Sequence, residues 1–396
     1  MKNTKLLVLA AFAALSLSAC GGNGGQKSGE LPSGGTNVDV STETGTSELK
    51  ARLNNVSEAY SKAAFTSFGI KNEFKNGNAD VSFNYASMIS GKLSAKNFAS
   101  TVEFNMDAAN ASLAIKDVKG ALDLDASLKM DEEADPVALK HSLSVEGFNA
   151  AAYATDKKVY VDLSSAANRT VIQGFESFAN GIFTDLGLPA SMIAPMIQSM
   201  AGIDVSALVG ENGFAINDAI DELVPERKFY VEAGVDINVG LINEAMAKAV
   251  PAEGLDEFVT EFVTLSKETG AFKFLTYAGK GFGLQANITK ESLKALVKAT
   301  AKEGEEQVDI DSYVKNLDIV ASIYFDENAL LSKIGFAVDA GIKYSDSETG
   351  ISVEANLKAE DETTISYNSV SVNLPAATEL AKFPALQLPQ SEPVEE

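Results

Sequence analysis

The sequence is poor in the side chains on which most protein chemistry depends. Its 396 residues include no Trp, one His (His141), one Cys (Cys20) and only three Arg. Metal sites built from His and Cys, internal disulfides and most His-dependent catalysis need more of these residues than the chain provides. We therefore expect no metal, no cofactor and no enzymatic activity.

Positive charge is also scarce. The chain has 32 Lys and Arg residues against 55 Asp and Glu residues, which gives a formal net charge of −23 and an isoelectric point near 4.5. This balance opposes electrostatic binding to the phosphates of nucleic acids and to anionic lipid headgroups, so we expect no nucleic acid partner. Because 45% of the residues are apolar and only 22% are charged, the chain can still build a substantial core.

Residues 1–19 have the three parts of an export signal. Two Lys residues lie within the first five positions, an apolar run extends from Leu6 to Leu15, and Leu17-Ser18-Ala19 precedes Cys20. The apolar run is shorter than the ~20 residues that a membrane-spanning helix needs. An aliphatic residue and two small residues in front of a Cys resemble the lipobox of bacterial lipoproteins.

This resemblance implies the fate of Cys20. Its thiol would receive a diacylglyceryl group, and cleavage before it would make it the first residue of the mature chain. Two or more acyl chains hold a protein stably on a membrane. We therefore expect a lipid-anchored protein outside the cytoplasm, on the outer face of the cell membrane or, if the host has an outer membrane, in its periplasm or on that membrane.

Composition divides the rest of the chain into three parts. Residues 20–46 are rich in Gly, Ser and Thr and predict a lipidated flexible tether, whereas residues 383–396 contain three Pro and several Glu and predict a disordered acidic tail. Residues 47–382 predict the folded part. This part is either one enlarged sheet or two stacked units that divide near residue 225.

The folded part opens with a helical pattern. Leu49, Leu53, Val56 and Tyr60 recur at the spacing of one helix face, and Ser47 is the expected N-cap. A 3.6-residue period with one apolar stripe indicates a helix packed against a core. The sequence therefore predicts a helix from about residue 47.

Apolar residues then alternate with polar residues in two blocks, separated by a helical stretch. The blocks cover residues 81–163 and 319–372, and we interpret Asn76-Gly77-Asn78 and Lys119-Gly120 as breaks between short strands. A change of phase near Asn368-Ser369 predicts a bulge. Such alternation is typical of antiparallel strands with one face in a core. The predicted fold class is α+β, with a long antiparallel sheet and helices.

The order of these elements resembles that of the half-barrel lipoproteins that handle lipids in bacterial envelopes. The segments that carry the resemblance are Ala152-Tyr153 with Val159 to Asp162, Leu284 to Leu293, and Asp326 to Phe336. In that group a long curved antiparallel sheet packs helices on its concave face and encloses an apolar cavity for acyl chains. The resemblance implies the same arrangement for residues 47–382.

Apolar residues of the helical stretch are candidates for the wall of such a cavity. Met and Phe side chains suit a wall that adapts to varied apolar ligands, although the same pattern also fits an ordinary helical core. The candidates are Phe175, Phe178, Ile182, Met192, Met196, Ile197 and Met200. We interpret His141 as a surface residue on the polar side of its strand.

Two functions remain open from the sequence. The first is a membrane-anchored envelope lipoprotein that binds or carries a lipid or other apolar ligand between its sheet and its helices. The second is a structural or surface interaction lipoprotein with a filled core and no small ligand. The first function requires apolar surface that stays accessible, whereas the second does not.

Overall fold

The computed structural model describes most of the chain. The described residues are 29–85, 88–107, 110, 112–130, 137–201, 205–232, 255–300, 309–375 and 381–382. The predicted export signal, Cys20 and the predicted acidic tail lie outside the described residues.

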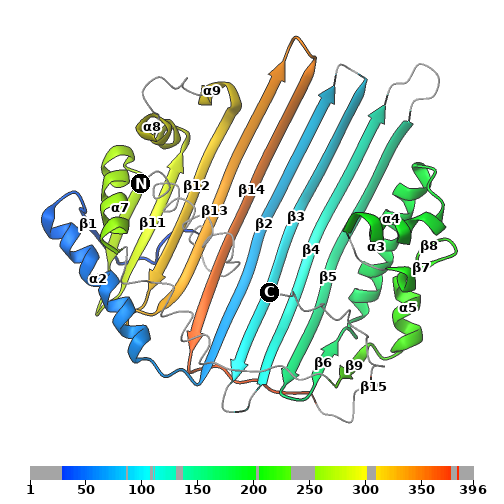
Figure 1. Cartoon of the computed structure of the whole chain (residues 1–396), viewed down its shortest axis with the longest axis horizontal. Helices are drawn as coiled ribbons and strands as arrows, with labels where there is room; N and C mark the ends of the chain where they lie inside the picture. Colours follow the sequence, from blue (N-terminus) through cyan, green and yellow to red (C-terminus); the bar gives the residue numbers. More distant parts are fainter. Residues whose placement is uncertain are drawn as a thin grey trace, which may run out of the picture.

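An antiparallel sheet of 13 strands dominates the fold (Figure 1). Its order is β1-β10-β11-β12-β13-β14-β2-β3-β4-β5-β6-β9-β15, and only the pair of β9 and β15 is parallel. The strands are β1 (Thr36–Val38), β2 (Ser67–Tyr85), β3 (Ile89–Asp107), β4 (Ser112–Met130), β5 (Val137–Thr155), β6 (Val159–Asp162), β9 (Lys228–Val231), β10 (Phe272–Thr276), β11 (Phe282–Thr289), β12 (Val314–Phe325), β13 (Leu331–Asp346), β14 (Ile351–Tyr367) and β15 (Ala381–Lys382). The short strands β7 (Val209–Gly210) and β8 (Gly213–Phe214) form a separate pair.

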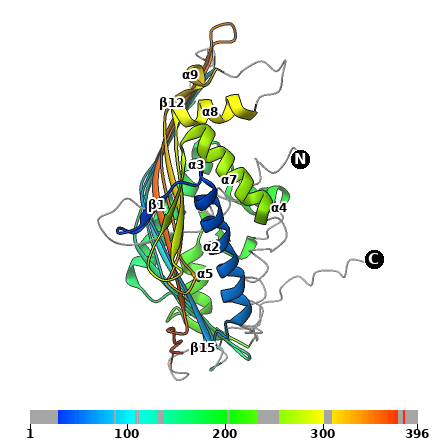
Figure 2. The same cartoon turned by 90° about the vertical axis from the view of Figure 1, so that its left-hand side faces the viewer.

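The helices form two groups at opposite ends of this sheet (Figure 1). They are α2 (Glu43–Lys62), α3 (Ala166–Asp185), α4 (Ala190–Ala201), α5 (Ile216–Leu223), α7 (Leu255–Thr269), α8 (Lys290–Thr300) and α9 (Ile310–Tyr313), with a 3₁₀ turn, η1 (Ser206–Leu208). In one group α7 packs against β10 and α8 against β11 and β12, and in the other α3 packs against β5. Figure 2 shows both groups on the same side of the sheet. None of the described helices is both long enough and apolar enough to cross a bilayer.

The largest core lies beneath α2, α7 and α8. Phe262 of α7, Phe274 of β10 and Phe282 of β11 are fully buried there, and the four residues of the predicted helical stripe in α2 are buried with them. The prediction of an amphipathic helix in this region is confirmed. A stripe repeating every three to four residues lies on one helix face, so it can meet a sheet along its whole length.

The folded part begins earlier than the sequence predicts. Leu31 is 5% exposed and its N–H donates to Oε1 of Gln285 over 3.1 Å, while β1 pairs with β10. Helix α2 begins at Glu43, because Oγ1 of Thr42 accepts a hydrogen bond from the N–H of Gly45 over 3.0 Å. The predicted tether end at residue 46 and the predicted Ser47 cap are therefore wrong.

Two predicted strand breaks lie inside strands. Strands β2 and β4 each contain 19 residues, and Asn76-Gly77-Asn78 and Lys119-Gly120 fall at shifts of register within them. Asn76 adopts a φ of 55°, a left-handed conformation that Asn tolerates better than most residues. A bulge absorbs an extra residue without ending the strand, so the interpretation of these segments as breaks is wrong.

The bulge predicted near Asn368-Ser369 is also wrong. Strand β14 ends at Tyr367, and Asn368 turns the chain out of the sheet with a φ of 56°. The side-chain Oδ1 of Asn368 accepts a hydrogen bond of 2.7 Å from the N–H of Thr66, which fixes this exit beside the start of β2. The change of phase in the sequence marks the end of a strand.

The two predicted blocks of strands meet in the middle of one sheet. Strand β14 of the last block pairs with β2 of the first block along most of its length, from Ile351 opposite Tyr85 to Tyr367 opposite Phe68. The described strands before and after residue 225 therefore belong to one sheet and do not form two stacked units. The prediction of an α+β fold with a large antiparallel sheet is confirmed.

Candidate functional site

The four central strands β13, β14, β2 and β3 carry apolar side chains in rows that cross the sheet. Val81 of β2 lies opposite Leu93 of β3 and Ala355 of β14, and Ala355 lies opposite Ile342 of β13. Directly opposite residues of neighbouring strands point to the same side of a sheet. These four residues therefore form one apolar row.

Three further rows run parallel to this one. Two lie nearer the β2–β3 and β13–β14 hairpins, and one lies farther from them. We call the whole set the apolar face. Its residues are Ala79, Val81, Phe83, Tyr85, Ile89, Leu93, Ala95, Ala340, Ile342, Tyr344, Ile351, Val353, Ala355 and Leu357.

The large side chains of the apolar face are open to solvent. Ile342 is 51% exposed, Leu93 49%, Tyr85 47% and Leu357 46%. Single exposed apolar side chains are normal on proteins, whereas a contiguous apolar patch of a few hundred Å² is often functional. The apolar face is such a patch and is a candidate binding surface.

The apolar face lies on the same side of the sheet as both helix groups. Ile334 alternates in phase with Ile342 along β13 and lies opposite Ile323 of β12, which is part of the core beneath α2, α7 and α8. At the other end the row through Leu93 continues across β4 to His141 of β5, which contacts α3. The two helix groups therefore stand on either side of the apolar face.

The opposite side of these strands is polar. Ser94 of β3 donates to Oδ1 of Asp80 of β2 over 2.6 Å, and Lys315 of β12 pairs with Glu354 of β14. A hollow of about 500 Å³ on this side is lined mainly by Ser and Lys residues of β3, β4 and β5. The central sheet is thus amphipathic, with one face for water and one face of apolar side chains.

The end of this surface farthest from the hairpins is closed by packing. Phe68 at the start of β2 is 5% exposed and Ile365 of β14 is 8% exposed. Tyr367 lies between the rings of Phe65 and Phe68, with centroids 4.6 and 5.7 Å away. The apolar surface of these strands is therefore closed at this end and open at the rows near the hairpins.

The residues predicted to line a cavity lie on α3 and α4, at the β5 end of the sheet. Phe175 is 43% exposed and packs on Phe214, with ring centroids 6.1 Å apart, while Met192 is 51% exposed. Ile182, Met196 and Ile197 are half-buried. Met200 lies near the end of α4. The fully buried residue of α4 is Ile193, which was not among the predicted residues.

A pocket of about 320 Å³ lies between α3, α4 and β8. It is lined by Phe183, Leu188 and Ile193 together with polar residues such as Asn180 and Glu211, and by none of the seven predicted residues. The side-chain amide of Asn180 forms hydrogen bonds to both the N–H and the C=O of Phe214, over 2.7 and 3.1 Å. This amide is thus used to hold β8 against α3.

His141 is not the surface residue that the sequence suggested. Its Nε2 lies 2.7 Å from Oδ2 of Asp185, and its ring meets the edge of Phe178, with centroids 6.3 Å apart. The interpretation was wrong because residues 141 and 143 share a side of β5, and Leu143 is buried under α3. The His141 ring fits beneath Gly181, where a Cβ would approach its Nδ1 to 2.8 Å.

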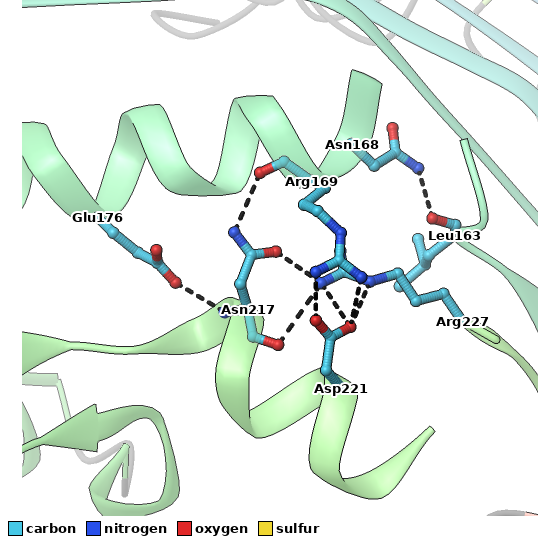
Figure 3. Close-up of polar contacts among 7 residues, drawn as sticks. All are labelled: Leu163, Asn168, Arg169, Glu176, Asn217, Asp221 and Arg227. Carbon is cyan, nitrogen blue, oxygen red and sulfur yellow. Dashed lines mark hydrogen bonds and ion pairs between the residues drawn. The ribbon is translucent and has the colours of Figure 1, made fainter. Parts of the chain in front are cut away.

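Two of the three Arg residues hold α3 and α5 together (Figure 3). Asp221 of α5 accepts hydrogen bonds from both Arg169 of α3 and Arg227, which is 4% exposed. Asn217 accepts from Nη2 of Arg227 over 2.7 Å and donates to the C=O of Arg169 over 3.0 Å. Hydrogen bonding from Arg227 holds the pKa of the Asp221 carboxyl below its usual value.

Asn168 fixes the start of α3 to strand β5. Its side chain is fully buried, accepts from the N–H of Asn149 over 2.8 Å and donates to the C=O of Asn149 over 2.6 Å. It also donates to the C=O of Leu163 over 3.1 Å (Figure 3). The Asn168 amide thus takes the place of a neighbouring strand at this point of β5. The buried polar side chains that join α3 to α5 and to β5 therefore have a role in the fold.

In the part of the chain that the structure describes, neither metal-ligand geometry nor similarity to known proteins singles out a site. Within the described residues no group of three or more His, Cys, Asp and Glu side chains is placed to hold a metal ion. The sequence matches no known protein family model and no curated protein. The apolar face is therefore the candidate site that rests on the most observations.

Sequence reasoning missed the apolar face, although most of its residues lie in the two blocks that were predicted to form strands. Val81 and Ile342 are separated by 261 positions and are brought into one row only by the pairing of β14 with β2. The alternation of each strand shows that one side is apolar, but it does not show which strands a helix covers. Because the helices lie at the two ends of the sheet, the apolar side chains of the central strands stay exposed.

Proposed function

We propose that this chain is a lipid-anchored, non-enzymatic envelope protein that binds the acyl chains of a lipid on its apolar face. The observation that supports the proposal is the contiguous, solvent-exposed apolar patch of β13, β14, β2 and β3 on the helix side of the sheet. The resemblance of Leu17-Ser18-Ala19-Cys20 to a lipobox supports the proposal, because a lipid anchor would hold the chain where lipids are abundant. The proposal includes a half-barrel curvature of the sheet, with the helices on its concave side.

The dimensions of the apolar face favour a lipid over a protein partner. Seven residues along each of four strands give a surface of about 20 Å by about 15 Å, or roughly 300 Å². A stable protein interface covers about 800 Å² on each partner. One leaflet of a bilayer has a hydrocarbon depth of about 15 Å, so an acyl chain of ordinary length fits the patch.

The flanking helices favour a bound lipid over direct insertion of the face into a bilayer. A helix packed on a sheet projects about 10 Å from it, which is the diameter of a helix with its side chains. Both helix groups stand on the side of the apolar face (Figure 2). A flat membrane would therefore meet α7 and α3 before it reached Val81 or Leu93. A single lipid molecule has no such restriction.

The test is to identify what the protein carries from cells. The chain from residue 21 onward, produced without lipidation and without detergent, would be analysed by native mass spectrometry and by organic extraction of the bound material. We expect a lipid in the parent protein and its loss when Val81→Asp and Leu93→Asp are combined. A bound acyl chain would bury the two new carboxylates, which is unfavourable. Ser82→Asp, on the polar side of the same strand, is the matched control and should retain the lipid.

The outcomes separate the two functions that the sequence left open. Lipid in the parent and in Ser82→Asp, with none in the double variant, supports acyl binding on the apolar face. A parent protein free of lipid from every preparation, with unchanged stability in all variants, would favour a structural or surface interaction lipoprotein. Lipid retained by the double variant would place the ligand elsewhere, for instance in the pocket between α3 and α4.

A further inference from the structure

The apolar face changes in chemical character along the strands. The rows farthest from the hairpins contain only aliphatic side chains, including Leu357 and Ala79, then Ile342, Val81 and Leu93. The next rows toward the hairpins contain two tyrosines. They are Tyr344 of β13 and Tyr85 of β2.

The tyrosine end is open to water, as are the aliphatic rows of the apolar face. Tyr85 is 47% exposed, Tyr344 is 44% exposed and Tyr313 of α9, which stacks on Tyr344 with centroids 6.3 Å apart, is 45% exposed. At the other end of the same strands Phe68 and Ile365 are buried. A Tyr side chain combines an apolar ring with a hydroxyl group and suits a boundary between apolar and polar surroundings.

The two hairpins at the tyrosine end carry negative charge and no positive charge. Residues 345–351 of the β13–β14 hairpin carry Asp346 and Glu348 and no cationic residue, and residues 84–90 of the β2–β3 hairpin carry no charged residue at all. Asp346 accepts hydrogen bonds from the N–H of Glu348 over 2.9 Å and from Oγ1 of Thr349 over 2.7 Å. These bonds favour the charged carboxylate. An anionic group would be repelled here, whereas an ammonium group would be attracted.

We propose that the bound lipid lies along the strands with its headgroup at the hairpin end, beside Tyr85 and Tyr344, and that this headgroup is zwitterionic. The inference rests on the proposed function. The aliphatic rows hold the acyl chains, the tyrosine hydroxyls donate to the phosphate or ester oxygens, and Asp346 and Glu348 attract the ammonium group. A headgroup in the opposite orientation would meet the aliphatic rows, which offer it no hydroxyl group.

The absence of Trp from the chain makes the orientation measurable. Tyr85→Trp and Leu357→Trp each introduce a single fluorophore at the two ends of the apolar face, about 20 Å apart along the strands. The unlipidated chain from residue 21 onward would be mixed with phosphatidylcholine vesicles. Their acyl chains would carry bromine, which quenches Trp fluorescence on contact, either near the headgroup or near the methyl end. Ser82→Trp, on the polar side, is the matched control.

The two reporters should respond in opposite ways. Bromine near the headgroup should quench Tyr85→Trp at least twofold more than Leu357→Trp, bromine near the methyl end should do the reverse, and Ser82→Trp should not respond. Equal or inverted quenching would overturn the orientation while leaving acyl binding intact. A complete lack of quenching in both reporters, with no lipid detected by native mass spectrometry in the parent, would overturn the proposed function itself.

The headgroup preference has its own test. The parent chain should take up roughly threefold to tenfold more phosphatidylcholine than phosphatidylglycerol from mixed vesicles, because two exposed carboxylates each contribute a modest electrostatic term. Combining Asp346→Asn with Glu348→Gln should reduce that ratio toward one at low salt. Lys343→Gln on the same hairpin strand but on its polar side is the control. An equal uptake of both lipids by the parent would overturn the zwitterionic assignment.

Discussion

The hydroxyl oxygens of Tyr60 in α2 and Tyr367 at the end of β14 lie 2.8 Å apart. Tyr367 donates its hydrogen to the C=O of Leu331 over 3.0 Å, and the N–H of Leu331 donates to Tyr60 over 3.0 Å. Tyr60 must therefore be the donor between the two hydroxyls. The three bonds form a closed ring that joins α2, β13 and β14, and it closes the end of the sheet opposite the hairpins.

Removing either hydroxyl should destabilise the fold. Tyr60→Phe and Tyr367→Phe each leave backbone groups of Leu331 with one partner fewer at a largely buried site, so each should lower the free energy of unfolding by about 1–3 kcal/mol. The double variant should cost less than the sum, because both changes break one shared ring. Urea unfolding of the four proteins gives the interaction energy. Strict additivity would show that the ring does not act as a unit.

The same pair predicts weaker stability at alkaline pH. Burial raises the pKa of both Tyr60 and Tyr367 above the ordinary value near 10. Above about pH 10 the unfolded chain loses these protons while the folded chain keeps them, so the free energy of unfolding falls as the pH rises. Urea unfolding between pH 8 and pH 11 should show a shallower decline when Tyr60→Phe and Tyr367→Phe are combined. Identical slopes in parent and variant would contradict the prediction. Burial also raises the pKa of Tyr277 to about 12, and that contribution cancels in the comparison.

The cluster between α3 and α5 should be sensitive to one amide. Asn217→Ala removes the partner of Arg227 Nη2 and of the Arg169 C=O, and should lower the free energy of unfolding by about 1–3 kcal/mol, because Arg227 is buried. Asn212→Ala, at an exposed position before β8, is the control and should change stability by less than about 0.5 kcal/mol. Equal effects of the two substitutions would show that the cluster contributes little.

The proposed lipid anchor is testable at Cys20. Intact-protein mass spectrometry of the mature parent should show the loss of residues 1–19 and a diacylglyceryl adduct. Cys20→Ser should lack both, because a hydroxyl group does not replace the acceptor thiol. Since Ser and Cys are similar in size, this variant tests the sulfur atom itself. An adduct on Cys20→Ser, or a parent chain cleaved elsewhere, would contradict the predicted lipobox.

The sequence predicted which segments are helices and which are strands better than the residues at which they begin and end. The stripe from Leu49 to Tyr60 predicted a helix correctly because one face of it is buried along its whole length. Asn76 and Gly77 were interpreted as a break because residues that favour turns also favour bulges, and the pairing of the flanking strands decides between the two. His141 was misplaced because its side of the strand was assigned from its own polarity and not from that of Leu143.

The candidate site could not be predicted from any single segment, because it is formed by pairing between distant strands. Phe175 and Met192 were chosen for their apolar character, yet a helix that packs at the edge of a sheet leaves part of its apolar stripe in water. Tyr85 and Tyr344 belong to strands separated by more than 200 residues, and only the order β13-β14-β2 places them on one surface. Register across a sheet is set by tertiary pairing, which local periodicity does not specify.

The pairing of β14 with β2 also constrains the order of folding. The apolar face straddles this pair, so it exists only after the last long strand has joined the first, across a separation of some 270 residues. Contacts of such high sequence separation form slowly and leave unpaired strand edges exposed in the meantime. A chain that loses β14 would retain β2 as an unpaired edge, and aggregation before folding is complete would be the main risk. Helper proteins that shield strand edges until synthesis is complete would relieve this risk.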